Sequence, residues 1–357
     1  EDVSLDYEEQ VEKWREIFLD AVKIRMRSDV RIGTALSGGL DSSATFCAMN
    51  YLSNQDVNHD KEAKDWQNGF CAHYPGSILD ETKWARVVTD AINIPLNEVN
   101  IDPLNCGWSI NDALYHVEDP YLTLPLPMLA TYRAISNSGI KVTLDGHGAD
   151  ELFSGYGHLT SAFKSSNPKE TTELVSIINS LTSGEYLVES GNLYLNFFKK
   201  KFIETLKTHL RKPRDYLKAI LGKAEWEFVR YKLEHNDQSH PQFKKLDPLS
   251  QNLYEIFHIK ELPTLLRNYD RYSMSSGVEV RMPFMDHRLV TYTFSLPWTS
   301  KVGGTYTKRI MRDALKGILP ESIRTRRDKI GWNAPLHEWL QGPLKSEIEI
   351  FILNQGI

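Results

Sequence analysis

The segment Ser37-Gly38-Gly39-Leu40-Asp41-Ser42-Ser43 combines the residue types that bind phosphate groups. It follows a short apolar run and precedes a helical pattern, so its two glycines let the backbone curl close to a ligand and point successive N–H groups at an anion. The hydroxyls of Ser37, Ser42 and Ser43 add donors. Asp41 stands where a carboxylate would hold Mg²⁺ against the same phosphates. The segment has neither the lysine of a P-loop nor the spacing of a dinucleotide-binding loop, and the remaining alternative is a strand–turn–helix connection capped by aspartate or serine.

A second glycine-rich segment, residues 145–156, has the same character. Gly146 and Gly148 suit a turn under a ligand, and Asp150 stands where the next helical pattern begins. A single carboxylate at a helix start is as typical of a cap as of a metal ligand. Two carboxylates, Asp41 and Asp150, each placed where a strand gives way to a helix, together predict oxygen ligands for a hard cation such as Mg²⁺.

The hydrophobic pattern before residue 145 predicts alternating strands and helices that would bring the two segments together. Short apolar runs predict strands over residues 32–36, 69–74, 96–101 and 140–144. Helices are expected over residues 7–27, 42–52, 127–136 and after the pair Asp80-Glu81, whose charges would offset the helix dipole. Such alternation is typical of a mainly parallel, doubly wound α/β sheet, whose ligands bind at the carboxyl ends of the strands. Both segments follow such an end, so we expect them to form one site.

From about residue 159 the pattern changes to helices without clear strands. Helical segments are expected near residues 170–181, 193–210, 215–235 and 253–266, and another over residues 305–316, which Gly317 and Pro320 would end. We therefore expect one continuous domain in two parts. Residues 1–158 would form the α/β core, and residues 159–357 a helical extension that completes the active site.

The composition is that of a soluble globular protein. The 357 residues carry 42 Lys and Arg against 47 Asp and Glu, a net charge of −5, so neither nucleic acid nor an anionic membrane is an expected partner. No apolar run reaches the ~20 residues that would span a bilayer. Cys47, Cys71 and Cys106 have no C-x-x-C or zinc-ligand spacing, as expected of buried thiols in the cytoplasm.

The chain resembles the synthetase domain of the asparagine synthetase B family, part of the ATP-pyrophosphatase group. Matching residues run in order from about residue 5 to residue 340, and an ordered set of this length does not arise by chance. Besides the two glycine-rich segments they are Ser28-Asp29-Val30, Asp80-Glu81, Leu262-Pro263, Leu266-Arg267, Asp270-Arg271-Tyr272-Ser273-Met274, residues 279–286, Thr307-Lys308, Gly317-Ile318-Leu319-Pro320 and Arg327-Asp328-Lys329-Ile330-Gly331. The resemblance implies a sheet of the adenine-nucleotide α-hydrolase, or PP-loop, type.

The resemblance also implies a ligase that amidates a carboxylate, with the conversion of aspartate to asparagine as the leading reaction. The carboxylate attacks the α-phosphate of ATP, pyrophosphate leaves, and ammonia then displaces AMP, with Mg²⁺ neutralising charge. By match to the family pattern, Asp41 and Asp150 would bind Mg²⁺, and Lys329 would stabilise the phosphate in the transition state. The ATP-binding residues implied are Leu36, Ser37, Gly38, Gly39, Asp41, Ser42, Ala72, Asp145 and Gly146.

Two features depart from the family pattern. His147 stands where many members have a glutamate in the second glycine-rich motif. A neutral imidazole accepts a proton near pH 7, which makes His147 a candidate general base, but a different acceptor acid or a role in shape alone fits equally. Glutamine-dependent members begin with a catalytic cysteine in a glutaminase domain, whereas residue 1 here is Glu1. We therefore expect either that an N-terminal glutaminase domain has been removed from this sequence, or that the enzyme uses free ammonia or ammonia delivered by a partner protein.

Three functions remain open at this point. An asparagine-forming ligase leads, followed by a ligase for a uronic-acid sugar or another non-aspartate acid, and then by a nucleotide-binding module without catalysis. Asp41, Asp150 and Lys329 argue against the third. Arg281 and Asp286, in a matching segment, would form either a buried structural pair or a contact to substrate. The oligomeric state is open, a homodimer included.

Overall fold

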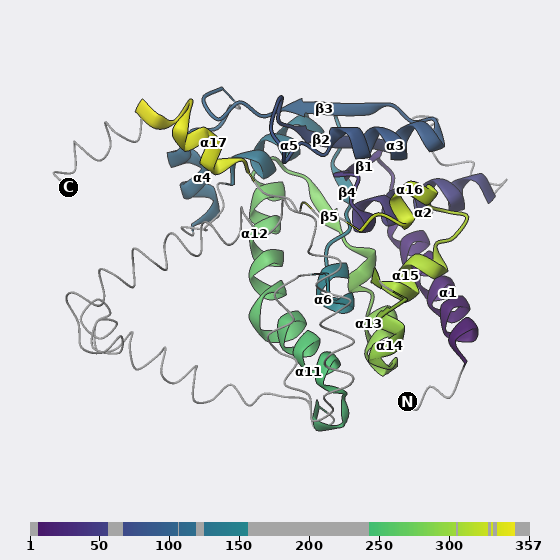
Figure 1. Cartoon of the computed structure of the whole chain (residues 1–357). Coiled ribbons are helices and arrows are strands. Elements are labelled where there is room, and N and C mark those ends of the chain that lie inside the picture. The colour runs from purple at the N-terminus through teal and green to yellow at the C-terminus, as the bar shows by residue number, and fades with distance from the viewer. Residues whose placement is uncertain are drawn as a thin grey trace, which may run out of the picture.

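A five-stranded parallel sheet organises the chain (Figure 1). The structure, a computed structural model, describes residues 6–55, 67–105, 107–118, 125–155, 243–304, 306–327, 330 and 334–346. The strands are β1 (Ile32–Ala35), β2 (Gln67–His73), β3 (Leu96–Asn100), β4 (Val142–Leu144) and β5 (Glu279–Arg281), in the order β3-β2-β1-β4-β5. Each pairs in parallel with its neighbours, which confirms the expected α/β class.

Helices of three to five turns cover the sheet, and shorter ones connect them. They are α1 (Tyr7–Arg25), α2 (Leu40–Gln55), α3 (Thr82–Ile92), α4 (Ile110–Val117), α5 (Leu126–Asn137), α6 (Ala149–Phe153), α11 (Pro248–Glu255), α12 (Leu262–Met274), α13 (His287–Ser295), α14 (Trp298–Lys301), α15 (Arg309–Ala314), α16 (Glu321–Arg324) and α17 (Leu336–Gln341). An antiparallel pair, β6 (Val302–Gly303) and β7 (Tyr306–Thr307), precedes α15. Among the described helices, none is long and apolar enough to cross a membrane.

Two hydrophobic clusters lie on opposite faces of the sheet. The larger contains Trp14 and Phe18 of α1 with buried side chains of α2, α3, α13 and α15. The smaller contains side chains of α4, α5 and α12. Neighbouring residues of β2 divide between them, Phe70 to the smaller and Cys71 to the larger, because successive side chains of a strand point to opposite faces. Figure 1 shows α12 and α4 on one side and α1 and α2 on the other.

The sequence predicts most of these elements, with three corrections. The helix expected over residues 253–266 is instead the end of α11, a π-helical turn over Ile256–Lys260 and the start of α12. The expectation of helices without strands after residue 158 is wrong, because Glu279–Arg281 pairs with β4 and completes the sheet. The expected helix over residues 305–316 begins later, at Arg309, since Tyr306–Thr307 pairs with β6 instead. Gly317 does adopt a left-handed φ of 82° beyond α15. The helices expected between residues 170 and 235 lie outside the described residues.

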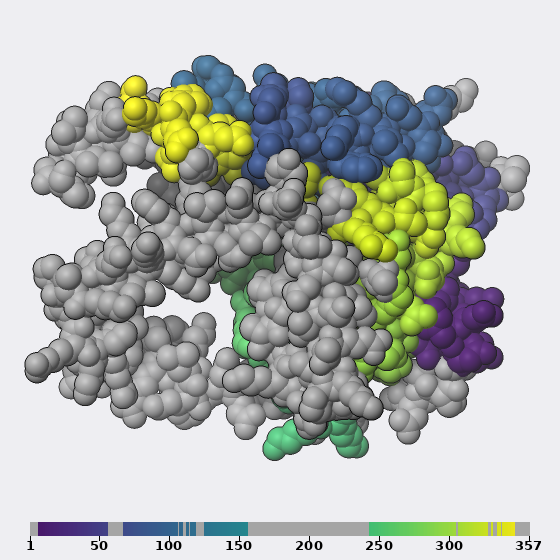
Figure 2. All heavy atoms as spheres, in the orientation of Figure 1, coloured from purple at the N-terminus to yellow at the C-terminus, as the bar shows by residue number. Residues whose placement is uncertain are grey.

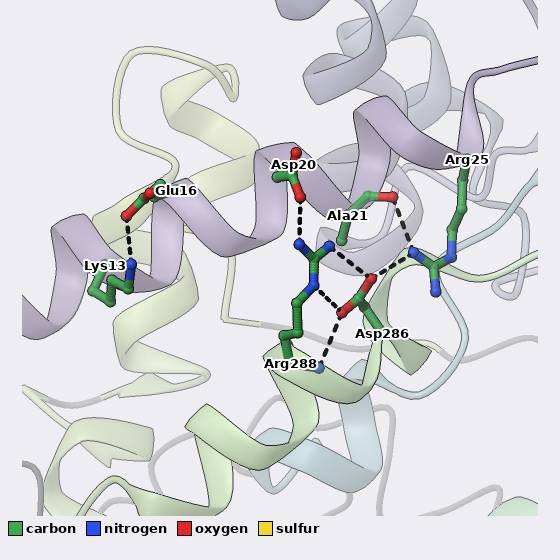
Figure 3. A network of polar contacts seen from close by, with 7 residues as sticks. All are labelled: Lys13, Glu16, Asp20, Ala21, Arg25, Asp286 and Arg288. Carbon is green, nitrogen blue, oxygen red and sulfur yellow. Dashed lines mark hydrogen bonds and ion pairs between the residues drawn. The ribbon is translucent and has the colours of Figure 1, made fainter.

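Asp286 ties α1 to α13 (Figure 3). Its carboxylate accepts hydrogen bonds from the Arg25 side chain at 2.9 Å and from the Nε of Arg288 at 3.0 Å. Burial alone would raise the pKa of Asp286, but the hydrogen bonds from Arg288 and Arg25 hold it well below its usual range. Arg281 pairs with Glu279 at 2.7 Å. The sequence left open whether Arg281 and Asp286 form a structural pair or contact substrate. The contacts support a structural role for Asp286, but its partners are Arg25 and Arg288 and not Arg281.

The segment that carries α15 and α16 returns to the amino-terminal half of the chain. α15 contacts α1, and α16 contacts both α2 and α3. Figure 2 shows this segment, in yellow-green, lying against the blue surface of the amino-terminal part. From this segment Lys308 contacts Asp41 and Arg326 contacts Gly38, both in the first glycine-rich segment.

Candidate active site

The two glycine-rich segments meet at the carboxyl ends of β1 and β4. A Cβ atom added to Gly146 would lie 2.5 Å from the carbonyl carbon of Asp41 and 2.6 Å from the nitrogen of Ser42, so only glycine allows this approach. Beneath them the buried Asp145 accepts a hydrogen bond from the Ala35 N–H at 3.0 Å. The expectation that the two segments lie together is confirmed.

Donor groups converge in the first loop. The Gly39 N–H donates to the Ser37 Oγ at 3.1 Å, and the hydroxyls of Ser37 and Ser42 lie 3.2 Å apart. Gly38 has a φ of 74°, which favours glycine, and α2 begins directly after the loop. An N–H group and two hydroxyls beside a helix N-terminus are donors of the kind that bind anions.

Asp41 and Asp150 converge on one cation, the ammonium group of Lys308. The Lys308 Nζ lies 2.6 Å from both carboxylate oxygens of Asp41 and 2.5 Å from the Oδ1 of Asp150. Burial alone would lower the pKa of Lys308, but the charges of Asp150 and Asp41 outweigh it and raise the pKa. The ammonium is therefore charged at neutral pH and compensates the two carboxylates.

These carboxylates fit the Mg²⁺ that the sequence predicts. Hard cations prefer carboxylate oxygens, and the contacts with Lys308 demonstrate that Asp41 and Asp150 can face one cation together. Within the described part of the chain, no group of three or more His, Cys, Asp or Glu side chains gathers as a metal site. A cation held here would accordingly take its further oxygen ligands from bound phosphates and water.

The backbone at Lys308 places this ammonium group. Lys308 has φ 57° and ψ 33°, a left-handed conformation that is uncommon for a residue with a side chain. Its N–H donates to the carbonyl of Phe153, the last residue of α6, at 3.3 Å. Asp150 lies on the same helix. The Arg312 guanidinium donates to the Thr307 carbonyl at 2.9 Å and to that of Arg324 at 2.5 Å, which holds the turn. The sequence marks Thr307-Lys308 only as a matching motif, and this contact to two distant carboxylates is not visible in it.

His147 packs against an aromatic ring beside the second loop. Its ring centroid lies 3.9 Å from that of Tyr269. Burial lowers the pKa of His147 to about 4, an effect that the Asp150 charge opposes in part. Its Nδ1 atom is buried without a hydrogen-bond partner among the described residues. The imidazole is thus neutral at pH 7, and its low pKa makes it a weak base in this conformation.

The remaining sequence-predicted residues lie under or beside the loops. Leu36 and Ala72 are buried in the core, so a ligand would contact them through the backbone. The other oxygen of Asp145 accepts a hydrogen bond from the Tyr132 hydroxyl at 2.7 Å, and burial raises the pKa of this carboxyl to about 6. Lys329 lies outside the described residues, and its role stays a prediction.

Comparisons with known proteins agree on one family. The model of the family described as asparagine synthase matches residues 13–355. A protein named asparagine synthetase [glutamine-hydrolyzing] 3 of Bacillus subtilis (strain 168) is 28% identical in an alignment of 338 positions that covers 90% of this chain and 48% of that protein. A protein named amidase chyE of Penicillium rubens is 24% identical in an alignment of 383 positions, gaps included, that covers 98% of this chain and 56% of that protein. The chain therefore spans about half the length of the curated relatives it matches.

Proposed function

Because the chain belongs to the asparagine synthase family, we propose that it uses ATP to amidate a carboxylate through an acyl-adenylate. The observation that carries this proposal is the convergence of Asp41 and Asp150 on one cation position beside the loop that carries Ser37 and Ser42. A cluster of N–H and hydroxyl donors suits pyrophosphate, the leaving group of attack at the α-phosphate. Two carboxylates suit the Mg²⁺ that accompanies ATP.

Each group of the site has a role in this reaction. The Gly39 N–H and the hydroxyls of Ser37 and Ser42 would bind phosphate oxygens, and Asp41 and Asp150 would hold Mg²⁺. Bound there, Mg²⁺ supplies positive charge that offsets the charge of the phosphates. The backbone near Leu36 and Ala72 would border the adenosine. Lys329 is assigned to the transition-state phosphate by the family pattern.

The proposed reaction has two steps, formation of the acyl-adenylate and its attack by ammonia. An oxygen of the acceptor carboxylate bonds to the α-phosphorus while the bond to pyrophosphate breaks. Ammonia then bonds to the acyl carbon, AMP leaves, and one proton of the nitrogen must be released. His147 is neutral at pH 7 and can accept that proton, although its pKa of about 4 favours transfer onward to water. We propose ammonia as the immediate nitrogen donor, in keeping with the relatives named as glutamine-hydrolyzing.

Two classes of acceptor are candidates. Aspartate leads because relatives are named asparagine synthetases. A neutral His147 at a position where many family members carry glutamate favours a second candidate, a uronic-acid sugar or another non-aspartate acid. A relative named as an amidase supports testing acids beyond aspartate.

The experiment supplies ATP, Mg²⁺ and ammonium with aspartate or glucuronate and measures AMP and pyrophosphate. Release of both with aspartate, abolished by Asp41→Ala, is the expected result. Release with glucuronate alone would replace aspartate by the second candidate. If none of a panel of carboxylic acids releases pyrophosphate while ATP still binds, the chain is a nucleotide-binding module and the proposed ligase reaction is wrong.

A further inference from the structure

Arg326 reaches the phosphate-facing loop from the segment after α16. Its guanidinium donates to the Gly38 carbonyl at 3.3 Å and to a carboxylate oxygen of Glu81 at 3.2 Å. The same group lies over the Trp84 ring, 4.5 Å from its centroid. Arg326 and Glu81 are both buried, which is unusual for charged side chains.

Glu81 is the N-cap residue of α3, yet its side chain makes no capping hydrogen bond there. The preceding residue, Asp80, takes that role, because its carboxylate accepts from the N–H of Thr82 at 2.8 Å. The Glu81 carboxylate is thereby directed to Arg326. Burying an ion pair costs desolvation energy that its attraction does not reliably return, so stability alone is a weak reason for this arrangement.

The contact with Arg326 determines how one peptide of the loop is oriented. The peptide between Gly38 and Gly39 is planar and trans, so its C=O and its N–H point in opposite directions. With the Gly38 carbonyl held by Arg326, the Gly39 N–H points the other way, to the Ser37 hydroxyl. The other side of Gly38 rests on α3, since a Cβ atom there would lie 2.3 Å from the Ala85 nitrogen.

We propose that Arg326, held by Glu81, is a positioning residue that keeps the Gly39 N–H turned toward the phosphates of the nucleotide. The inference rests on the proposed function, in which this loop binds the phosphates of ATP. Arg326 acts through the peptide and makes no contact with the ligand. Its loss therefore weakens binding of ligands that carry phosphate and leaves binding of the nucleoside unchanged.

The test measures binding to the full chain by calorimetry with three probes: ATP with Mg²⁺, pyrophosphate with Mg²⁺, and adenosine. Arg326→Met keeps much of the packing on Trp84 but removes both hydrogen bonds. It weakens ATP and pyrophosphate binding about tenfold and leaves adenosine binding unchanged. Arg326→Lys gives an intermediate loss, because an ammonium group lacks the guanidinium fork. The matched control is Arg86→Met, which removes from α3 a side chain paired with the exposed Glu98 of β3 and changes none of the three affinities.

Thermal unfolding of each variant separates positioning from folding. A fall in melting temperature with equal loss for all three probes, or unchanged pyrophosphate binding, would overturn the inference. If Arg326→Met does not fold, Arg326→Lys alone provides the test. We then expect weaker pyrophosphate binding and unchanged adenosine binding. Unchanged binding of both probes would overturn the inference. If the wild-type chain binds neither ATP nor pyrophosphate, the proposed function fails and the inference with it. If wild type and variants bind both equally, only the inference fails.

Discussion

Lys308 is an internal cation at the position where the proposed Mg²⁺ would bind. Its ammonium contacts both Asp41 and Asp150 at 2.5–2.6 Å and is buried. Two carboxylates that face each other repel unless a cation lies between them. In the conformation described here the protein supplies this cation itself, and a metal ion that enters must compete with it.

Replacing Lys308 by methionine should therefore open the position to a free divalent cation. We expect Lys308→Met to bind Mn²⁺ about tenfold more tightly than the wild-type chain in the absence of nucleotide, since the competing charge is gone. Electron paramagnetic resonance of free Mn²⁺ measures this affinity. A second readout is the melting temperature, which added Mn²⁺ should raise more in the variant than in the wild type.

The matched control is Lys13→Met, which removes a lysine from an exposed pair with Glu16. It should leave Mn²⁺ binding unchanged. Equal Mn²⁺ affinity of Lys308→Met and wild type would mean that Asp41 and Asp150 do not form a cation site on their own.

The buried Asp145 should make stability depend on pH. Burial raises its pKa from 3.8 to about 6, so the folded chain holds this proton where the unfolded chain has lost it. Its contribution to stability is complete below about pH 4 and is lost as the pH rises through about 6. Asparagine at this position stays neutral and can still accept the Ala35 hydrogen bond. The free energy of unfolding of Asp145→Asn should thus rise relative to wild type by up to about 3 kcal/mol between pH 4 and 7.

Urea denaturation at several pH values measures this difference. His147 contributes in the opposite direction, because its pKa is lowered from 6.5 to about 4 and its stability contribution is lost as the pH falls through that range. Both proteins contain His147, so its effect cancels when the variant is compared with wild type. A difference that does not change with pH would contradict the assignment to Asp145.

At the scale of elements, α1 is held to α13 by a polar contact. Asp286 joins α1 to α13 through Arg25 and Arg288, and its side chain is nearly buried (Figure 3). Asp286→Ala leaves both arginines without this carboxylate and should lower the free energy of unfolding by about 2 kcal/mol. The loss is smaller than for a fully buried ion pair, because the arginines are partly exposed to solvent. Urea denaturation at pH 7 measures the loss.

The control for this contact lies on the same helix. Lys13 and Glu16 form an exposed pair on α1, also drawn in Figure 3, and Glu16→Gln should change stability by less than about 0.5 kcal/mol. Equal effects of Glu16→Gln and Asp286→Ala would show that burial does not distinguish the two contacts.

The sequence predicts those elements whose side-chain pattern is local. α1 shows helical spacing of Trp14, Phe18 and Val22, and β1 is a short apolar run, so both could be predicted. β5 could not, because its three residues include the charged Glu279 and Arg281 and become a strand only by pairing with β4. The same holds for the site. The two glycine-rich loops are readable, whereas the contact of Lys308 with Asp41 joins residues 267 positions apart.

At the scale of the whole molecule, the sheet and its core are built from both ends of the chain. β5 completes a sheet whose other four strands precede residue 145. The larger hydrophobic cluster joins Trp14 and Phe18 to Phe284, Ile310 and Ile323. We propose that the α/β core over residues 1–158 and the helical extension form one continuous domain, and this packing supports a single cooperative unit.

A fragment of residues 1–158 should therefore not fold alone. It would expose the edge of β4 and the apolar faces that α13, α15 and α12 cover, a loss of burial that exceeds the usual margin of stability. We expect no cooperative thermal unfolding and no ATP binding from this fragment. Adding residues 159–357 as a second polypeptide should restore both, with the intact chain as the control. Cooperative unfolding of residues 1–158 alone would contradict this expectation. It would mean that the amino-terminal part is an independent domain and that packing against α15 and β5 adds little to its stability.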